Sequence, residues 1–342
     1  MTGTGFLPLK GEYHDNFLTA QASARGNLDR EKQDSLFDRL DWLDTLHRMV
    51  LRDRQPLLLR AHDNDADLWM PLMQNGKGEY QSLANWYNFT WRPIFGAYYD
   101  EVTRLALLRQ VALRSQERAR RLVLSPVPDE DGSARLLCAA FEQAGWHVDM
   151  QQCDENHYLP IAGRSFDEYW QGRSSQLRNT VKRKGKKGIV SIRIETSFTE
   201  NSWADYERVY AQSWKPNEGS PAFLRQLAKQ ESDAGCLRLG IAYIGGQPVA
   251  AQFWTTENGI ALIHKLAYDE RHIAASPGTL LTAAMFQYAI DNDRVHEIDY
   301  GTGTDAYKKE WMEAMRPRYR IEMLWPNHPL NWPRIIRNSL RK

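Results

Sequence analysis

The stretch that decides the fold is residues 237–268, LRLGIAYIGGQPVAAQFWTTENGIALIHKLAY. It contains three strand-like runs, Leu237 to Ile244, Val249 to Thr255 and Ile260 to Tyr268, which are separated by the short connections IGGQP and ENG. Gly and Asn in such tight connections are typical of β-hairpins. The sequence therefore predicts three consecutive antiparallel strands.

The segments before these strands have their own clear order. Ile189 to Glu195 alternates apolar and polar residues, as a half-buried strand does. A helix follows from Trp203 to Trp214, capped by Ser202, and a second runs from Pro221 to about Glu231, with Ser220 as its N-cap and proline at its first position. The predicted order up to this point is strand, helix, helix.

The segments after the three strands complete the pattern. Ser276-Pro277-Gly278 opens a very apolar helix that extends to about Asn292. Glu297 to Tyr300 is predicted as a short strand, Asp305 to Met312 as a short helix and Tyr319 to Leu324 as a last strand. The whole order from Ile189 onward is strand, helix, helix, three antiparallel strands, helix, strand, helix, strand.

The first half of the chain is less regular. Residues 1–33 are polar and weakly patterned, and we expect a loose arm with one short edge strand near Phe17. Residues 34–162 alternate helix-like and strand-like segments, which implies an α/β domain. After Leu324 the segment WPNHPLNWPRIIRNSLRK is broken by prolines and basic at its end, and we interpret it as a surface tail.

Composition narrows the class of protein. The 342 residues suffice for about two domains, and 44 Lys and Arg against 43 Asp and Glu give a net charge of +1, without the global basic charge typical of nucleic-acid binding. No apolar run approaches the ~20 residues of a membrane span, and the first twenty residues do not resemble a signal peptide. Three scattered cysteines fit a reducing compartment. We therefore expect a cytoplasmic protein without a bound metal.

The order from Ile189 onward resembles the GNAT acetyltransferase fold. The sequence is similar to one branch of it, the acetyltransferase domain of cellulose-biosynthesis proteins, which is related to the Fem peptidyltransferases. The resemblance is carried by FDEYW with the following basic helix (166–187), HKLAYDE (264–270), SPG (276–278) and IDYGTGTDAYKKEW (298–311). It covers about residues 166–325 well and residues 34–162 only in outline.

This resemblance implies an α/β (α+β) protein with tandem GNAT-like domains, each a mixed, mostly antiparallel sheet flanked by helices. We expect an N-terminal arm at 1–33, a degenerate GNAT-like domain at 34–164, a GNAT-like acyltransferase domain at 165–325 and a C-terminal tail at 326–342. The first domain has no glycine motif at its phosphate-loop position. No active donor site is expected there.

Ser276, Pro277, Gly278 and Thr279 are the candidate donor-binding residues. A serine cap followed by proline at the first helical position leaves the backbone N–H groups of Gly278, Thr279 and Leu280 unpaired, and together with the helix dipole these form an anion site. The resemblance implies that the pyrophosphate of acetyl-CoA or another acyl-CoA, bound as co-substrate, lies there. The alternative is a plain Ser-Pro helix start.

The segment 298–311 and strand 260–268 supply the candidate catalytic residues. The resemblance implies that Tyr307 protonates the departing thiolate, with Lys308 holding a phosphate or carboxylate; the alternative is that Tyr307 packs and the lysine is solvated. Asp299 and His264, near strand ends, are the candidates for the general base that deprotonates the amine. A lone strand histidine is more often a core residue, so Asp299 is favoured over His264.

The basic run at residues 173–187 is a third candidate functional feature, after the donor-binding and catalytic residues. It contains Arg173, Arg178, Lys182, Arg183, Lys184, Lys186 and Lys187, with no acidic residue among them. A solvated helix face is the ordinary explanation, and capture of an anion such as a CoA phosphate, a nucleotide-linked acceptor or RNA is the functional one. The run has no aromatic residue, which disfavours a platform for single-stranded nucleic acid.

The sequence thus predicts an acyl-CoA-dependent N-acyltransferase, acetyltransferase-like, that acts on an amine of a sugar or small metabolite. The first alternative is a Fem-like aminoacyltransferase that takes aminoacyl-tRNA, with tRNA as a less favoured partner. The second is a non-enzymatic binding module on the same fold, because fold alone does not fix function.

Overall fold

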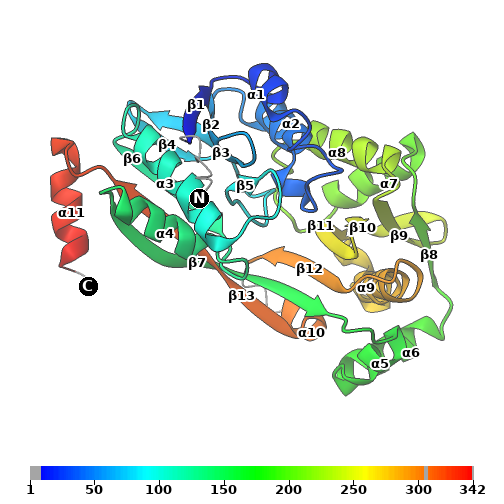
Figure 1. Ribbon diagram of the computed structural model, residues 1–342. Coiled ribbons are helices and arrows are strands. Elements are labelled where there is room, and N and C mark those ends of the chain that lie inside the picture. Colours follow the sequence, from blue (N-terminus) through cyan, green and yellow to red (C-terminus); the bar gives the residue numbers. More distant parts are fainter. Residues whose placement is uncertain (1–8, 304–306, 341–342) are drawn as a thin grey trace, which may run out of the picture. The chain divides into compact units, whose positions relative to one another are not determined.

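The computed structural model describes residues 9–303 and 307–340, and the chain divides into two compact units. Unit 1 comprises Met1–Asp154 and Arg316–Lys342, and unit 2 comprises Glu155–Met315. The chain passes from one unit to the other within two strands, β7 (His147–Pro160) and β13 (Ala314–Leu324) (Figure 1).

Unit 1 is built on a mixed sheet. Its strands follow the order β1 (Lys10–His14), β2 (Pro56–His62), β3 (Asp67–Gly76), β4 (Glu79–Ser82), β6 (Arg121–Val127) and β13, with β5 (Ile94–Phe95) paired to β3. The neighbours are antiparallel except for β4 and β6, which are parallel. Strand β13 joins this sheet through the register pair Ile321 and Leu124.

The helices of unit 1 are α1 (Phe17–Ala24), α2 (Leu40–Val50), α3 (Glu101–Ser115), α4 (Ser133–Gln143) and α11 (Trp332–Ser339). Helix α3 begins at Asp100, whose side chain accepts a hydrogen bond from the Thr103 N–H as an N-cap. Its buried side chains, including Leu107 and Val111, join the apolar core that Leu59 and Ile321 contribute from the sheet. Burial of this apolar face is the main stabilising term for such a unit.

The strands of unit 2 belong to the same continuous sheet and are mostly antiparallel. Its strands follow the order β7, β12 (Glu297–Thr302), β11 (Ile260–Tyr268), β10 (Gln247–Glu257), β9 (Leu237–Ile244) and β8 (Val190–Glu195). Only β11 and β12 are parallel among these described pairs. The three predicted antiparallel strands are confirmed, and the predicted fold class of mostly antiparallel sheets flanked by helices is confirmed as well.

The helices of unit 2 are α5 (Phe166–Gln171), α6 (Ser175–Gly185), α7 (Glu200–Ala211), α8 (Pro221–Asp233), α9 (Pro277–Gln287) and α10 (Lys308–Trp311). Helix α9 packs closely on β9, since a Cβ added at Gly240 would lie 2.5 Å from the Met285 sulfur. Helix α7 packs on β10 through Trp203, which meets Phe253 edge to face at 5.7 Å.

Four expectations are corrected by the structure. The short strand expected near Phe17 is helix α1, which begins where the Asn16 side chain accepts from the Thr19 N–H. The last strand lies in the sheet of unit 1, so the units divide at 154/155 and 315/316, whereas we expected a boundary at 164/165 and a tail from 326. The expected tail contains helix α11. The expected helix from Asp305 begins at Lys308, and residues 304–306 lie outside the described residues.

Candidate active site in unit 2

The candidate site lies where the two parallel strands β11 and β12 stop pairing with each other. Strands β11 and β12 pair only over Ile260–Leu262 and Glu297–Asp299 in the described part of the chain. Both strands continue beyond this pairing, to Tyr268 and Thr302. Beyond Leu262 the two strands therefore no longer pair with each other.

A cavity of about 310 Å³ lies within unit 2 at this place. Its lining comes from β10, from the separated part of β11, from the start of α9, and from β12 and α10. The lining includes Ser276, Pro277, Gly278, Thr279 and Tyr307, so the structure brings the expected donor-binding residues and the expected general acid into one cavity. Lys308, Asp299 and His264 do not belong to this lining.

The start of α9 presents two backbone donors. Pro277 occupies the first helical position and has no N–H to offer. The Leu280 N–H donates to the Ser276 carbonyl at 3.1 Å, so it is not a third free donor as expected. This leaves the N–H groups of Gly278 and Thr279, which are among the first four of the helix and have no partner within it.

Ser276 acts differently from a usual cap. Its backbone is left-handed, with φ 54° and ψ 46°, and its side chain makes no capping hydrogen bond. A left-handed non-glycine residue is uncommon, and a side chain that does not cap its helix leaves the N–H groups of the first turn uncovered. The Ser276 side chain therefore does not compete with a ligand for them.

Gly278 lies against an aromatic wall. A Cβ at this position would lie 3.1 Å from Cδ1 of Tyr268. The Tyr268 ring in turn contacts the ring of Trp214 at a centroid distance of 4.4 Å, and both rings line the cavity. The absence of a side chain at Gly278 thus keeps the backbone close to both the wall and the cavity.

A chain of buried hydrogen bonds fixes the first turn of α9. The Gly278 carbonyl accepts from the Thr282 hydroxyl at 2.9 Å, and that hydroxyl accepts from the Gln252 side-chain amide at 2.7 Å. The Gln252 carbonyl oxygen accepts from the Trp254 indole N–H at 2.9 Å. Because these groups are buried and satisfied, they hold the helix start rigidly against β10.

Tyr307 and Lys308 have different surroundings. The Tyr307 ring lies edge-on to Tyr300 at 5.7 Å, and both rings line the cavity. Lys308 is buried, and its ammonium donates to the Thr302 carbonyl and lies 5.7 Å from the Tyr300 ring. Lys308 therefore supports the backbone of the loop after β12, and it is not placed in the cavity as an anchor for a phosphate.

Asp299 holds the turn after β12. One of its carboxylate oxygens accepts from the Asn156 side-chain amide at 2.6 Å and from the Gly301 N–H at 2.7 Å. The residue is buried and precedes Tyr300, whose side chain is directed to the opposite face as the alternation of a strand requires. This geometry fits a structural carboxylate better than a base that contacts a substrate.

His264 is a packed residue. Its Nε2 shares a hydrogen bond with the Thr255 hydroxyl at 2.8 Å, and its ring stacks on Phe253 at 5.1 Å. Burial, and to a smaller degree the Lys265 ammonium, lower the pKa of His264 to about 3. A neutral imidazole with so low a proton affinity is a poor general base near neutral pH.

The basic run forms helix α6 and its surroundings. Arg173 precedes the helix and is paired with Glu313, so it does not share the free basic face. The ammonium of Lys184 donates to the Ala274 carbonyl, which lies just before α9. In the described part of the chain no carboxylate pairs with the six remaining basic side chains, Arg178, Lys182, Arg183, Lys184, Lys186 and Lys187.

Sequence reasoning missed several lining residues. Glu310 is an exposed carboxylate at the rim, and Gln252 is a buried amide in the wall. Glu310 stands within the KKEW segment that carried part of the resemblance, three residues after Tyr307, and helical spacing predicts that such a pair shares a face. Nothing in the sequence around Gln252 distinguishes it from an ordinary strand residue.

Among the described residues, three side chains outside the cavity bring metal-ligating atoms together. Atoms of Glu231, Cys236 and Glu257 all lie within 4.8 Å of one another, and none of the three residues lines the cavity. The Cys236 thiol donates to the Ala234 carbonyl at 3.5 Å. Separately, every helix among the described residues is too short or too polar to traverse a bilayer.

Part of unit 2 matches a known protein family. Residues 171–309, which lie within unit 2, match the family described as Acetyltransferase (GNAT) domain. No curated protein matches the sequence. The particular cellulose-biosynthesis-like branch remains a prediction.

Solved structures share the architecture at low sequence identity. FemX is 9% identical with a TM-score of 0.62, and the likeness covers 95% of this chain and 99% of that one. The C-terminal domain of an Agrobacterium fabrum protein named after lysylphosphatidylglycerol synthetase is 12% identical with a TM-score of 0.57, covering 95% and 96%. L-PGS from Bacillus licheniformis is 12% identical with a TM-score of 0.55, covering 93% and 95%. At these identities the likeness shows a shared fold and nothing further.

Proposed function

We propose that this protein is an acyl-CoA-dependent N-acyltransferase that transfers an acyl group, such as acetyl, to an amine of a sugar or small metabolite. The observation that carries the proposal is a cavity in unit 2 whose lining includes both Gly278 and Thr279, with their N–H groups at the start of α9, and Tyr307. An anion site and a proton donor in one cavity suit a donor with a pyrophosphate and a thiolate leaving group.

Donor binding begins at α9 in this proposal. The N–H groups of Gly278 and Thr279 donate to the pyrophosphate oxygens, and the helix dipole adds about 0.3–1 kcal/mol. The chain of hydrogen bonds through Thr282 and Gln252 keeps these donors aimed, so little ordering entropy is lost on binding. The thioester then extends along the part of β11 that lines the cavity, Leu266 to Tyr268, toward Tyr307.

The chemical step is a direct transfer. The amine nitrogen attacks the thioester carbonyl carbon, and the resulting oxyanion accepts a hydrogen bond from a backbone N–H on β10 or β11. The carbon–sulfur bond breaks, and the CoA thiolate takes its proton from the Tyr307 hydroxyl. The products are the amide and free CoA, and no covalent enzyme intermediate is needed.

The amine must lose a proton, and Glu310 is our candidate for its acceptor. Glu310 lines the same cavity as Tyr307, whereas His264 is packed against Phe253 and Asp299 accepts from Asn156 and the Gly301 N–H. An exposed carboxylate at the rim is able to take the proton directly or through one water molecule and to return it to solvent.

A second candidate function is transfer from aminoacyl-tRNA, and helix α6 favours it. Lys182, Arg183 and Lys186 line an open surface hollow of about 630 Å³. The link from Lys184 to Ala274 sets this basic helix beside the segment that leads into α9. Phosphates of a tRNA acceptor arm are suited to such a surface. The same basic face suits the phosphates of CoA, which keeps the acyl-CoA proposal first.

The test is a turnover assay with purified protein. Acetyl-CoA is mixed with a panel of amino sugars and small amines, free CoA is followed with a thiol reagent, and the product is identified by mass spectrometry. We expect amine-dependent CoA release that Tyr307→Phe slows. If acetyl-CoA gives no product with any amine while labelled aminoacyl-tRNA gives an acylated product, the tRNA function replaces the first proposal. Binding of acetyl-CoA without turnover across the panel would point to the non-enzymatic alternative.

A further inference from the structure

Helix α11 of unit 1 turns its apolar face outward. Trp332, Ile336 and Leu340 stand four residues apart and are 56%, 61% and 82% exposed, and Leu330 just before the helix is 69% exposed. Residues spaced by four share one face of a helix. A surface helix ordinarily buries its apolar stripe, so this arrangement is inverted.

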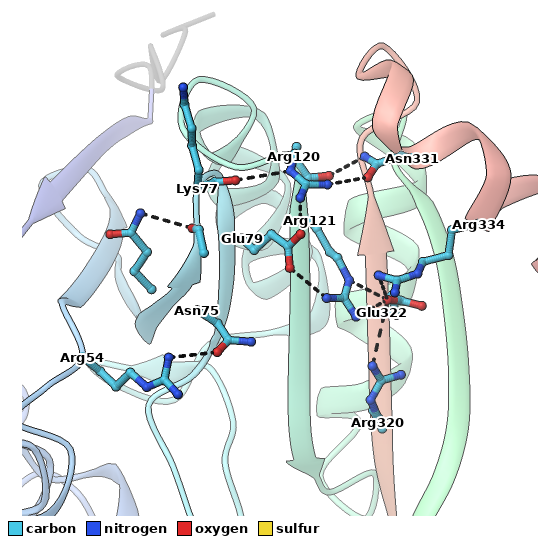
Figure 2. Close-up of polar contacts among 12 residues, drawn as sticks. Arg54, Asn75, Lys77, Glu79, Arg120, Arg121, Arg320, Glu322, Asn331 and Arg334 are labelled. Carbon is cyan, nitrogen blue, oxygen red and sulfur yellow. Dashed lines mark hydrogen bonds and ion pairs between the residues drawn. The ribbon is translucent and has the colours of Figure 1, made fainter.

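Polar side chains hold the inner face of this segment. Asn331 is buried, and its side-chain amide donates to the carbonyls of Arg120 at 2.7 Å and Trp325 at 2.9 Å (Figure 2). Asn338, seven residues on, is also buried. The Trp332 indole N–H donates to the Pro326 carbonyl at 2.8 Å. The segment is therefore held through the Asn331 amide, with Asn338 on its buried side, and its apolar stripe is left without a covering element in the described residues.

The surface beside the stripe has an excess of positive charge. Figure 2 shows Arg120, Arg121, Arg320 and Arg334 around the carboxylates of Glu79 and Glu322. The guanidinium nitrogens approach one oxygen of Glu322 at 2.6 Å from Arg121, 3.4 Å from Arg334 and 3.9 Å from Arg320. Four cations thus surround two anions.

The charge excess continues along the helix itself. Arg337 is exposed, and Arg341 and Lys342 follow in the sequence. No Asp or Glu occurs after Glu322. Apolar side chains on the outer face and cations on its flank therefore occur together over one short segment.

We propose that α11 is a docking element for an anionic lipid surface. An amphipathic helix that carries Trp and aliphatic residues on one face and arginines beside them lies in the headgroup region, where the apolar side chains enter the acyl boundary and the guanidinium groups contact lipid phosphates. Trp332 suits this place, since an indole has an apolar body and a polar N–H. The element lies on the surface and does not traverse the bilayer.

A second copy of the chain is the competing occupant, and the size and charge of this surface favour it less. Four exposed apolar side chains within one short segment are few beside the roughly 20–30 residues that each partner contributes to a stable protein interface. Two copies meeting through this face would also bring two arginine-rich surfaces together, and like charges repel. An anionic surface complements both the apolar stripe and its charge.

The experiment is vesicle flotation with the full chain. One set of vesicles is phosphatidylcholine alone, and the other contains about 30 mol% phosphatidylglycerol to give an anionic surface. We expect the parent protein to float with the anionic vesicles only, and raising the salt from about 0.1 M to about 0.5 M should weaken this binding because it shortens the range of the charge attraction.

Variants identify the surface. Ile336→Ser with Leu340→Ser should reduce anionic-vesicle binding tenfold or more, and Arg337→Glu should reduce it several-fold. The matched controls are Leu18→Ser, which removes an apolar side chain 80% exposed on α1, and Arg52→Glu at another exposed arginine; both should bind like the parent.

The proposal is overturned by either of two results. One is a parent protein that does not bind anionic vesicles. Light scattering then shows whether the parent is a monomer or a dimer, and a dimer that is lost in the Ile336→Ser, Leu340→Ser variant would identify a second copy as the occupant. The other is a variant that binds the vesicles as tightly as the parent does. Because these measurements involve no acyl donor, they stand apart from any outcome of the turnover assay.

Discussion

Replacing Gly278 by valine is the sharpest perturbation of the proposed donor site. The new Cβ would lie 3.1 Å from Cδ1 of Tyr268, which is closer than most such contacts, and 3.5 Å from its Cγ, and the two added methyl groups would extend into the cavity or the ring. Either direction keeps a phosphate oxygen from approaching the Gly278 N–H. The Thr279 N–H would remain, in a narrowed site.

The magnitude follows from the hydrogen bonds at stake. A hydrogen bond to a charged group contributes about 1.5–3 kcal/mol, so loss of one bond and weakening of the other costs about 2–3 kcal/mol of donor binding. That corresponds to a dissociation constant for acetyl-CoA raised about 30- to 150-fold. Gly278→Ala adds only the Cβ, and we expect a rise of a few-fold.

Folding should suffer less than binding. Overpacking costs about 1–3 kcal/mol in a closed core, and the Tyr268 ring borders a cavity into which it is able to shift. Isothermal titration calorimetry with acetyl-CoA gives the dissociation constants, and circular dichroism gives the melting temperatures. An unchanged dissociation constant in Gly278→Val would refute the placement of the donor at α9, and a collapse of the fold in both variants would show that the glycine serves packing.

Three other changes test individual residues. Tyr307→Phe keeps the ring and removes the proton donor, so kcat should fall tenfold or more at an unchanged melting temperature; equal turnover would remove Tyr307 from the mechanism. Lys308→Met should lower stability by about 1–3 kcal/mol, because the Thr302 carbonyl loses its donor, while KM for the donor changes little; a large rise in KM would restore Lys308 as an anchor. The pKa of His264 is lowered to about 3 by burial, below its unfolded value near 6.5, so its contribution to stability is complete above pH 6.5 and is lost as the pH falls toward 3, at no more than about 1.4 kcal/mol per pH unit. His264→Gln, which is still able to pair with the Thr255 hydroxyl, should flatten that part of the pH profile in urea denaturation; an identical profile would contradict the assignment.

The sequence was informative where local chemistry determines structure. The hairpins between β9, β10 and β11 follow from the Gly and Asn of their tight connections, and the start of α9 follows from Ser276-Pro277-Gly278. Both features depend on a few consecutive residues. Tyr307 was predicted from the resemblance, and the structure places it in the cavity with Gly278.

Long-range pairing was beyond that kind of reasoning. The residue pattern from Tyr319 to Leu324 predicts a strand but does not indicate its neighbour in the sheet. In the structure this strand pairs with β6. The packing of His264 depends on an irregularity of the ladder between β10 and β11, where the register shifts between Phe253 and Trp254. Such a bulge changes the face that a side chain takes, and no local signal announces it.

The hydrogen-bond partners of buried polar side chains also could not be predicted from the sequence. The role of Gln252 follows from its hydrogen bonds with Thr282 and Trp254, and Thr282 reaches it only because α9 packs on β10. The sequence around Lys308 suggests a solvated or ligand-binding lysine. In the structure the side chain is buried, and its ammonium donates to the Thr302 carbonyl at the end of β12. The outward apolar face of α11 likewise appears only once Asn331 and Asn338 are seen to be the buried residues.

The measurement that tests the central claim most directly is the melting temperature of the full chain with saturating acetyl-CoA, CoA or bulk tRNA. A ligand at about 100 times its dissociation constant stabilises the state that binds it by about 2.7 kcal/mol, which for a unit of this size raises the melting temperature by roughly 5–10 °C. We predict that rise with acetyl-CoA and with CoA, and its loss in Gly278→Val. No shift with either thioester or thiol, together with a rise caused by tRNA, would contradict the acyl-CoA assignment.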